Sequence, residues 1–351
     1  MQVKHKGRGA TSNASGRFER HHYVPLVERD KIETVVSTDH SRSIIAKNDS
    51  PDVPFSLSIN PYRGCEHGCI YCFARPTHAF LGLSPGLDFE TKIFAKPKAA
   101  ELLKKELAKP RYRPETLALG ANTDPYQPAE REHRITRGVL EVLAECDHPV
   151  AIVTKSNLVL RDLDLLTPMA AKGLAHVLVS ITTLDPDLAR NMEPRASTPE
   201  KRVNTLRELR DAGVPCGVLA SPMIPALNDS ELERILKVCA DAGATSAGYI
   251  LLRLPLELKD LFSEWLETHY PDKADHVLNL LRQSRGGALY RSDFGERMRG
   301  TGPYAELLEN RFRIAAKKHA LDKPLPKLDT TKFHPPTLPA AQLQLFSNLS
   351  P

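Results

Sequence analysis

The chain has few cysteines for its length and no long apolar run, and each absence excludes a class of protein. Its 351 residues contain only six cysteines, too few for the disulfide framework of a small secreted scaffold. No stretch approaches the roughly 18 consecutive apolar residues that a membrane-spanning helix needs. The polar N-terminal stretch lacks the apolar segment of a secretory signal peptide. The sequence therefore predicts a cytoplasmic protein with no membrane association.

Charged residues make up 26% of the chain, and their balance is mildly basic. The formal net charge is +5 and the isoelectric point is near 8.8. Basic residues gather in the first 20 residues and again between Arg297 and Lys323. Such stretches favour an acidic partner, and nucleic acid is the candidate, although a solvated basic surface explains the same pattern.

Short apolar runs alternate with helical patterns through the middle of the sequence. The strand candidates are Phe55–Ile59, Thr116–Gly120, Val150–Thr154, His176–Thr182, Pro215–Ser221 and Ser246–Arg253. The helix candidates are Lys98–Lys109, Glu132–Glu145, Asp162–Lys172, Pro199–Ala212, Asp229–Asp241 and Leu256–Glu267. Six strand-then-helix repeats imply right-handed crossovers and a parallel sheet, either doubly wound or closed wholly or partly into a barrel. In each case the functional residues should follow the carboxyl ends of the strands.

The regions on either side of this α/β core have a different composition. We expect residues 1–50 to form a basic N-terminal arm that is extended or partly disordered, and residues 51–270 to form the core domain. Residues 271–320 are expected to form a helical C-terminal extension. Residues 321–351 contain six prolines and few helix or strand signals, so an irregular proline-rich tail is predicted there.

Three of the six cysteines crowd into the segment "NPYRGCEHGCIYC", directly after the first predicted strand. They are Cys65, Cys69 and Cys72. Thiolates are soft ligands that select zinc, copper(I) or iron–sulfur clusters. A structural zinc site needs four ligands, so zinc would require His67 or His78 as the fourth. On a cluster of four irons, three thiolates leave one iron open to bind substrate or cofactor. The other three cysteines are isolated, as small buried apolar residues often are.

The spacing Cys-x3-Cys-x2-Cys, with Tyr71 before the last cysteine, resembles the signature of the radical S-adenosylmethionine (SAM) superfamily. The resemblance implies a partial (βα)6 TIM-like barrel with irregular terminal extensions. It also implies a [4Fe–4S] cluster held by Cys65, Cys69 and Cys72, with SAM chelated on the fourth iron and Tyr71 against its adenine. An external flavodoxin- or ferredoxin-type reductant would supply one electron. SAM would then be cleaved to a 5′-deoxyadenosyl radical that abstracts hydrogen from a substrate.

The resemblance also implies roles for polar residues that follow the second and third predicted strands. Thr123 and Asp124 lie where the family binds the methionyl end of SAM, although an Asx-type turn explains the same residues. Lys155 is placed to pair with the carboxylate of SAM, and a surface lysine is the alternative.

Later strand ends carry further candidates for SAM binding. Ser180 and Thr182 would bind the ribose, or would serve as hydrogen-bonded hydroxyls of a barrel core. Glu193 and Arg195 would contact SAM or pair with each other. Ser221 would shape the loop after the fifth strand, and Ile224 would pack on adenine.

Five motifs together resemble the spore photoproduct lyase-like branch of the superfamily. They are "NTDPYQP", "TKS", "SITT", "EPRASTPEKR" and "SPMIPALND". Within that branch, "KGRGA" near the start and "FGERMRGTGPYAELL" look like an uncharacterised bacterial subgroup. The resemblance suggests a lyase that acts on a DNA lesion. Modification of RNA or of a protein side chain by the same chemistry is a second expectation. A non-catalytic, metal-containing nucleic-acid-binding module is a third.

One position departs from the pattern of this branch. Its members carry a cysteine hydrogen donor two residues before the hydroxyl residue of the motif that matches "NTD", whereas this chain has Ala121 there, with Thr123 as the hydroxyl residue. Tyr126 is then the candidate hydrogen donor, on its position alone. The identity of the substrate therefore does not follow from the resemblance.

Overall fold

A seven-stranded sheet forms the centre of the protein. The computed structural model describes residues 5–19 and 32–337, and within them the strand order is β10–β9–β8–β7–β6–β3–β2. Neighbours from β10 to β3 pair in parallel, and β2 pairs antiparallel with β3. The bounds are β2 Ile45–Lys47, β3 Leu57–Ile59, β6 Leu117–Leu119, β7 Val150–Thr154, β8 Ala175–Ser180, β9 Cys216–Met223 and β10 Ala247–Leu251. No pairing joins β10 to β2 among the described residues, so the predicted partial barrel is confirmed.

Most helices in the connections between the parallel strands pack with this sheet in the apolar core, as crossover connections require. The bounds are α1 Leu87–Thr91, α2 Ala99–Leu107, α3 Glu130–His133, α4 Ile135–Glu145, α5 Leu163–Ala171, α6 Pro186–Met192, α7 Pro199–Asp211, α8 Leu232–Ala242 and α9 Leu258–His269. The start of α7 is fixed by Thr198, whose hydroxyl accepts a hydrogen bond from the Lys201 amide, and by Pro199 in the first turn. The core lies between helices and sheet and includes Cys146, Cys216 and Cys239 as buried apolar residues, as predicted.

The N-terminal region is more ordered than the sequence predicts. Strands β1 (Val35–Thr38), β5 (Lys92–Ala95) and β4 (Tyr62–Arg63) form a second, three-stranded sheet. Because β1 pairs with a segment more than fifty residues later in the chain, no local pattern signals it. Strand β2 also lies within the predicted arm. Within the extended or partly disordered arm expected over residues 1–50, the backbone thus pairs into sheets at β1 and β2, whereas residues 20–31 lie outside the described residues.

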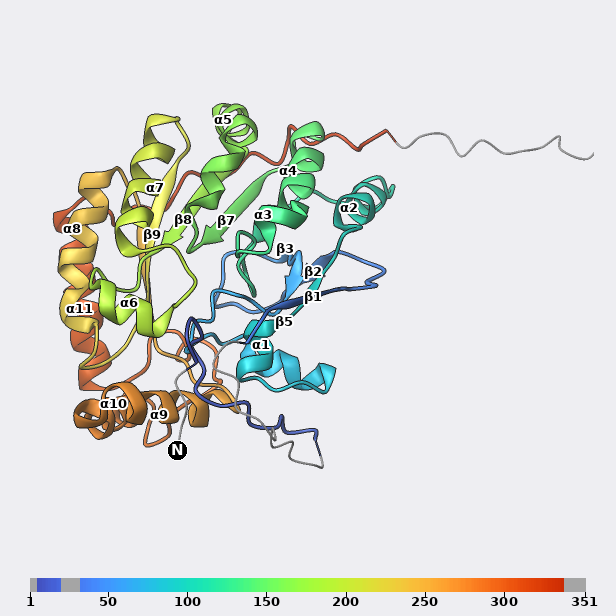
Figure 1. Cartoon of the computed structure of the whole chain (residues 1–351). Coiled ribbons are helices and arrows are strands. Elements are labelled where there is room, and N and C mark those ends of the chain that lie inside the picture. The colour runs from blue at the N-terminus through green and yellow to red at the C-terminus, as the bar shows by residue number, and fades with distance from the viewer. Residues whose placement is uncertain (1–4, 20–31, 338–351) are drawn as a thin grey trace, which may run out of the picture.

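The C-terminal region consists of two helices and a segment that lies along the amino ends of the strands. Helices α10 (Pro271–Gln283) and α11 (Pro303–Lys318) lie in the region predicted to be helical. After α11, residues 321–337 contain no regular element, and Figure 1 shows them running along the side from which the β7 and β8 arrows point away. The Asp329 amide bonds to the Gly173 carbonyl, and the His334 amide bonds to the Cys146 carbonyl. Residues 338–351 of the predicted tail are not described. No described helix is long and apolar enough to cross a membrane.

His148 is buried where this C-terminal segment meets the sheet, and it makes folding stability depend on pH. Its Nδ1 lies 3.0 Å from the Pro149 carbonyl and its Nε2 lies 2.8 Å from the Tyr112 hydroxyl, an arrangement that suits the neutral ring. Burial lowers the pKa of His148 to about 4, against an ordinary value of about 6.5. Between pH 6.5 and pH 4, His148 is protonated in the unfolded chain but stays mostly neutral in the folded chain. We therefore expect stability to fall by about 3 kcal/mol between pH 6.5 and pH 4.

Urea unfolding at pH 7 and at pH 4.5 measures this loss. Other buried histidines, His78 and His176, also have lowered pKa values because of burial. The comparison with His148→Gln separates the contributions, because glutamine does not titrate. The variant should lose less stability than the wild type over this interval. Equal losses in the two proteins would contradict the assignment.

Candidate active site

The three clustered cysteines lie in one tight loop, residues 64–72, which we call the cysteine loop. It follows β3 and β4 at the carboxyl edge of the sheet. Cys65 and Cys69 are buried and Cys72 is half-buried. Burial is the largest cause that raises the pKa of all three thiols. Gly64 and Gly68 have φ angles of 77° and 68°, a left-handed conformation that glycine adopts without strain. The loop therefore needs glycine at both positions to bring three thiols together.

The donor set fits an iron–sulfur cluster better than a single zinc ion. Within the described ranges, no group of three His, Cys, Asp or Glu side chains surrounds one metal position. His78 bonds through Nε2 to the Lys92 carbonyl at 3.0 Å, and His67 faces the Asp124 carboxylate at 3.4 Å. Neither histidine completes a zinc site with the thiols. A four-iron cluster does not need such a group, because each thiolate binds a different iron.

A buried ion pair supports the cysteine loop from behind. The Arg75 guanidinium donates to the carbonyls of Gly68 and Cys69 at 3.0 and 2.9 Å, and also to those of Pro85 and Gly86. It pairs with Glu90 at 2.5 Å, and both side chains are fully buried. One cation thus satisfies four backbone oxygens that would otherwise be buried without partners.

Residues 8–17, which we call the N-terminal strap, close over the same loop. The Gly9 and Ala10 amides donate to the two carboxylate oxygens of Glu90 at 2.9 and 2.8 Å. A Cβ atom on Gly9 would lie 1.9 Å from the Gly68 carbonyl oxygen, so the two backbones are in direct contact. Ala10 belongs to the same apolar cluster as Cys69. The "KGRGA" motif is therefore part of the cysteine site and is not a free basic arm.

Polar side chains from three neighbouring strand ends meet beside Tyr71. Lys155 Nζ follows β7 and lies 2.5 Å from the Ser180 hydroxyl, at the end of β8. Lys155, Ser180 and Thr182 all contact the Ser221 carbonyl in β9. Lys155 also lies 5.5 Å from the centre of the Tyr71 ring. Burial lowers the pKa of Lys155 to about 8. The structure thus brings together five residues from four separate segments of the sequence.

Glu193 and Arg202 complete this group; Glu193 is a candidate from the sequence, whereas no sequence pattern indicates Arg202. The Glu193 carboxylate accepts hydrogen bonds from Tyr71, from Thr182 at 2.7 Å, and from Arg202. Arg202 also donates to the Ser180 carbonyl at 3.1 Å. The alternative pairing of Arg195 with a neighbouring glutamate of its own motif is wrong, because Arg195 pairs with Glu66 at 3.2 Å. A buried carboxylate–guanidinium pair is visible only when the loop after α6 and the helix α7 are placed together.

The residues after β6 have structural partners. Thr123 donates to the Tyr62 carbonyl at 2.8 Å. The Asp124 carboxylate accepts from Thr154 and from the backbone amides of Tyr126 and Lys155, which includes the predicted Asx-type turn. The side chains of Thr123 and Asp124 thus form their hydrogen bonds with other groups of the protein.

Tyr126 does not fit the role of hydrogen donor. Its side chain is 1% exposed, and its hydroxyl donates to Asp162 at 3.1 Å. Burial raises the pKa of this hydroxyl well above its usual range. A hydroxyl held by a buried carboxylate stabilises the loop after β6, so we assign Tyr126 a structural position. Ile224, by contrast, is buried in the apolar cluster that contains Tyr71, where a planar ring could pack.

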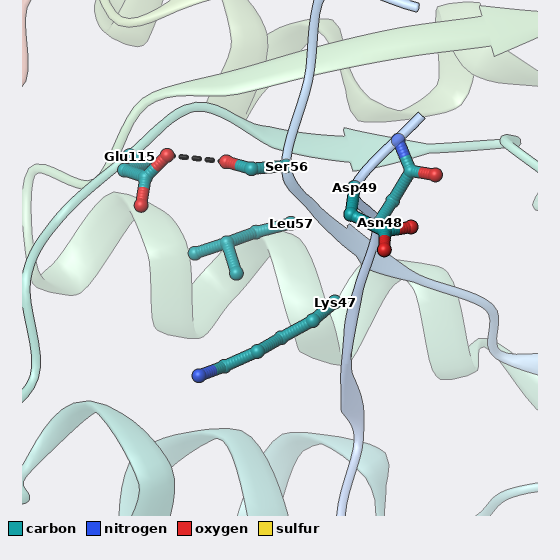
Figure 2. A pocket seen from close by; sticks show the side chains of 6 residues that line it. All are labelled: Lys47, Asn48, Asp49, Ser56, Leu57 and Glu115. Atoms are coloured by element: carbon teal, nitrogen blue, oxygen red, sulfur yellow. Dashed lines mark hydrogen bonds between the residues drawn. The ribbon is translucent and has the colours of Figure 1, made fainter. Parts of the chain in front are cut away.

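A cavity of about 410 Å³ lies away from this group. Its lining residues, drawn in Figure 2, are Lys47, Asn48, Asp49, Ser56, Leu57 and Glu115. Ser56 directly precedes β3, and Glu115 lies two residues before β6. The cavity therefore lies at the amino ends of these strands. The cysteine loop follows the carboxyl end of β3. This cavity is therefore not part of the candidate active site.

The family follows from a match over the core of the chain. Residues 59–239, just over half of the sequence, match the family model of the radical SAM superfamily. The chain belongs to the radical SAM superfamily. This radical SAM protein accordingly uses a [4Fe–4S] cluster and SAM, and Cys65, Cys69 and Cys72 are the three thiols present in its cysteine loop. The predicted family and cofactors are confirmed.

Relatives of this radical SAM protein occur in bacteria and archaea. An uncharacterised protein of Mycobacterium tuberculosis is 40% identical over 233 residues, which is 66% of this chain and 68% of the relative. An uncharacterised protein of Methanocaldococcus jannaschii is 27% identical, over 63% of this chain and 79% of the relative. Among solved structures, spore photoproduct lyase complexed with dinucleoside spore photoproduct aligns with a TM-score of 0.57 at 17% identity. That alignment covers 83% of this chain and 80% of the lyase, and it establishes the fold.

Proposed function

We propose that this protein is a radical SAM enzyme that acts on nucleic acid, with a lesion lyase-like reaction as the specific version. When bound and reduced by an external flavodoxin- or ferredoxin-type protein, the cluster and SAM supply a 5′-deoxyadenosyl radical for hydrogen abstraction. The observation that carries the proposal is the convergence of Tyr71, Lys155, Ser180 and Thr182 beside the cysteine loop. A cation, two hydroxyls and an aromatic ring are groups suited to a carboxylate, a ribose and an adenine.

Each residue of this group has a distinct part in binding SAM. Lys155 pairs with the carboxylate, while Ser180 and Thr182 donate to the ribose. Tyr71 and Ile224 enclose the adenine, and both belong to one buried apolar cluster. Glu193 and Arg202 hold these side chains in place and exclude water from beneath them.

Replacing Lys155 with methionine should weaken SAM binding without removing the cluster. A charge-assisted hydrogen bond contributes about 1.5–3 kcal/mol, so the dissociation constant should rise about tenfold to a hundredfold. Anaerobic equilibrium dialysis of the reconstituted protein with labelled SAM measures it. Lys237→Met is the matched control, because Lys237 pairs only with the exposed Asp241 on the surface of α8. Unchanged affinity in Lys155→Met, with iron content preserved, would refute the assignment.

Exposed aromatic rings beneath arginines favour nucleic acid as the substrate. Phe73, next to Cys72, is 41% exposed and lies 5.0 Å from the Arg253 guanidinium. Phe294 is 58% exposed and lies 4.6 Å from Arg297. Aromatic rings stack on bases and arginines bind phosphates, the combination that single-stranded nucleic acids need. Base stacking at Phe73 would hold a nucleotide beside the cluster.

If this protein catalyses a lyase reaction, its hydrogen donor cannot be the cysteine that the lyase-like branch uses, because this chain has alanine at that position. Ala121 occupies that position, and the remaining described cysteines, Cys146, Cys216 and Cys239, are buried in the core of the sheet and helices. We propose that the product radical would take a hydrogen atom from an external donor such as a small thiol, or back from 5′-deoxyadenosine, which would then recombine with methionine as SAM and return one electron to the cluster. Either route removes the need for a thiol in the site.

Anaerobic reconstitution followed by reduction with dithionite in the presence of SAM tests the proposal. We expect 5′-deoxyadenosine to form slowly alone and faster when a damaged single-stranded oligonucleotide is added. Deuterium transfer from a labelled oligonucleotide into 5′-deoxyadenosine would identify the substrate. An intact cluster, verified by electron paramagnetic resonance, that yields no 5′-deoxyadenosine would refute the enzyme and favour a non-catalytic module. Stimulation by RNA or by a peptide alone would refute the DNA version.

A further inference from the structure

A cavity of about 130 Å³ opens beside the cysteine loop. Four segments form its walls: the loop itself, the residues after β6, the residues after β7, and the start of α7. His67, Arg131, Asn157 and Lys201 represent these segments in that order. The Arg195 amide bonds to the His67 carbonyl, and the Ser197 amide bonds to the Lys155 carbonyl. The cavity therefore shares its walls with both the cysteine loop and the Lys155 segment.

The charge inside this cavity is positive. Arg131, Arg195 and Lys201 line it, and none of the described lining residues carries a carboxylate. Arg195 is paired with Glu66, which is buried behind the wall. In the described ranges, no carboxylate forms an ion pair with Arg131 or Lys201. Two cations therefore face the same small space without a protein counterion.

One further feature, the amino end of α7, points to an anion in this space. The thirteen-residue helix α7 begins at the cavity, and the amino end of a helix carries a partial positive charge. His67 lines the same cavity, but its Nδ1 lies 3.4 Å from the Asp124 carboxylate, so this histidine has a partner within the protein.

We propose that this cavity is a phosphate-binding site, with Arg131, Arg195 and Lys201 as its cations, that holds a backbone phosphate of the substrate. The source of the phosphate rests on the proposed function, since a free nucleotide offers the same chemistry. A space of this size encloses one group of a few atoms, whereas an acidic electron carrier would need a broad surface. A phosphate held here lies on the rim of the site, where a nucleotide that flanks the reacting base would pass.

Fluorescence anisotropy with a short labelled single-stranded DNA tests this site on the reconstituted protein. Arg131→Ala combined with Lys201→Ala should weaken binding about tenfold or more at low salt. It should also reduce the slope of log affinity against log salt by about 1 to 2. Arg207→Ala combined with Lys318→Ala is the charge-matched control, because both side chains are exposed away from the cavity. Competition with adenosine monophosphate and with inorganic phosphate identifies the source of the phosphate.

The outcomes separate this proposal from the proposed function. Equal weakening in both double variants, or in neither, would overturn the phosphate site. If adenosine monophosphate binds in a way that depends on Arg131 and Lys201 but the oligonucleotide does not bind, the phosphate belongs to a free nucleotide. If the variants slow reduction of the cluster by flavodoxin and leave oligonucleotide affinity unchanged, the surface serves the reductant and the proposal is wrong. Formation of 5′-deoxyadenosine without oligonucleotide, measured in parallel, tests SAM cleavage independently.

Discussion

Arg75→Met is expected to lower the free energy of unfolding by about 3–5 kcal/mol and to abolish stable cluster incorporation. The substitution leaves the fully buried Glu90 carboxylate without its partner, and breaking a buried pair from one side has a cost of that size. It also leaves the carbonyls of Gly68 and Cys69 without their donor, so the cysteine loop loses its shape. Urea unfolding of the apoprotein measures the first effect. Iron and sulfide per chain after anaerobic reconstitution measure the second.

Two controls separate the buried charge from general damage. Arg190→Met removes an arginine whose pair with Asp187 is largely exposed, and it should change stability by no more than about 1 kcal/mol. Arg75→Met combined with Glu90→Gln removes both charges and should recover part of the lost stability. A double variant as unstable as Arg75→Met would show that the four carbonyl contacts, and not the unpaired charge, dominate.

Gly9→Ala is expected to displace the N-terminal strap and to reduce cluster content sharply. The new methyl group would lie 1.9 Å from the Gly68 carbonyl oxygen, so one of the two backbones must move. Overpacking of this kind destabilises proteins by about 1–3 kcal/mol. The Gly9 and Ala10 amides would then lose Glu90, and the cysteine loop would be exposed to water. Limited proteolysis reports release of the strap, and iron content reports the cluster.

Gly138→Ala is the matched control for this prediction. Gly138 lies within helix α4, and a methyl group there would meet the Ala100 Cβ at 3.5 Å, an ordinary contact. Alanine in a helix interior is favoured over glycine by about 0.5–1 kcal/mol, so this variant should be as stable as the wild type or more so. Normal cluster content in Gly9→Ala would mean that the strap is dispensable for the site.

The sequence predicts the six parallel strands and their helices well because both carry local patterns. Runs such as Val150–Thr154 are apolar throughout, as strands buried on both faces are, and the structure has the same bounds there. The cysteine triplet and the polar residues that follow the strands lie at the carboxyl edge of the sheet, because each directly follows a strand that the sequence predicts. Parallel topology alone brings Lys155, Ser180 and Ser221 together once the strands are adjacent.

The parts that the sequence does not predict depend on pairing between distant segments. Strand β1 has only four residues, and its partner β5 is formed from a segment that shows no alternation of its own. Two buried ion pairs, Arg75 with Glu90 and Arg202 with Glu193, support the site. Charged residues are mostly exposed in proteins, so the sequence alone gives no reason to expect these four to be buried. Only the folded chain shows that each charge is buried opposite its partner. The sequence also does not show that Thr123, Asp124 and Tyr126 bond within the protein, because the same hydroxyl and carboxylate groups suit either a ligand or a turn.

The contacts of the N-terminal strap also constrain when the cysteine site can be completed during synthesis. Ser12 bonds to Glu264 at 2.6 Å, and Arg17 pairs with Glu257, 240 residues later in the chain. A ribosome adds about 5–20 residues per second, so roughly 12–50 seconds separate the strap from its partners on α9. The segment made first is thus among the last to find its place. An affinity tag fused ahead of the strap would therefore interfere with a late step of folding.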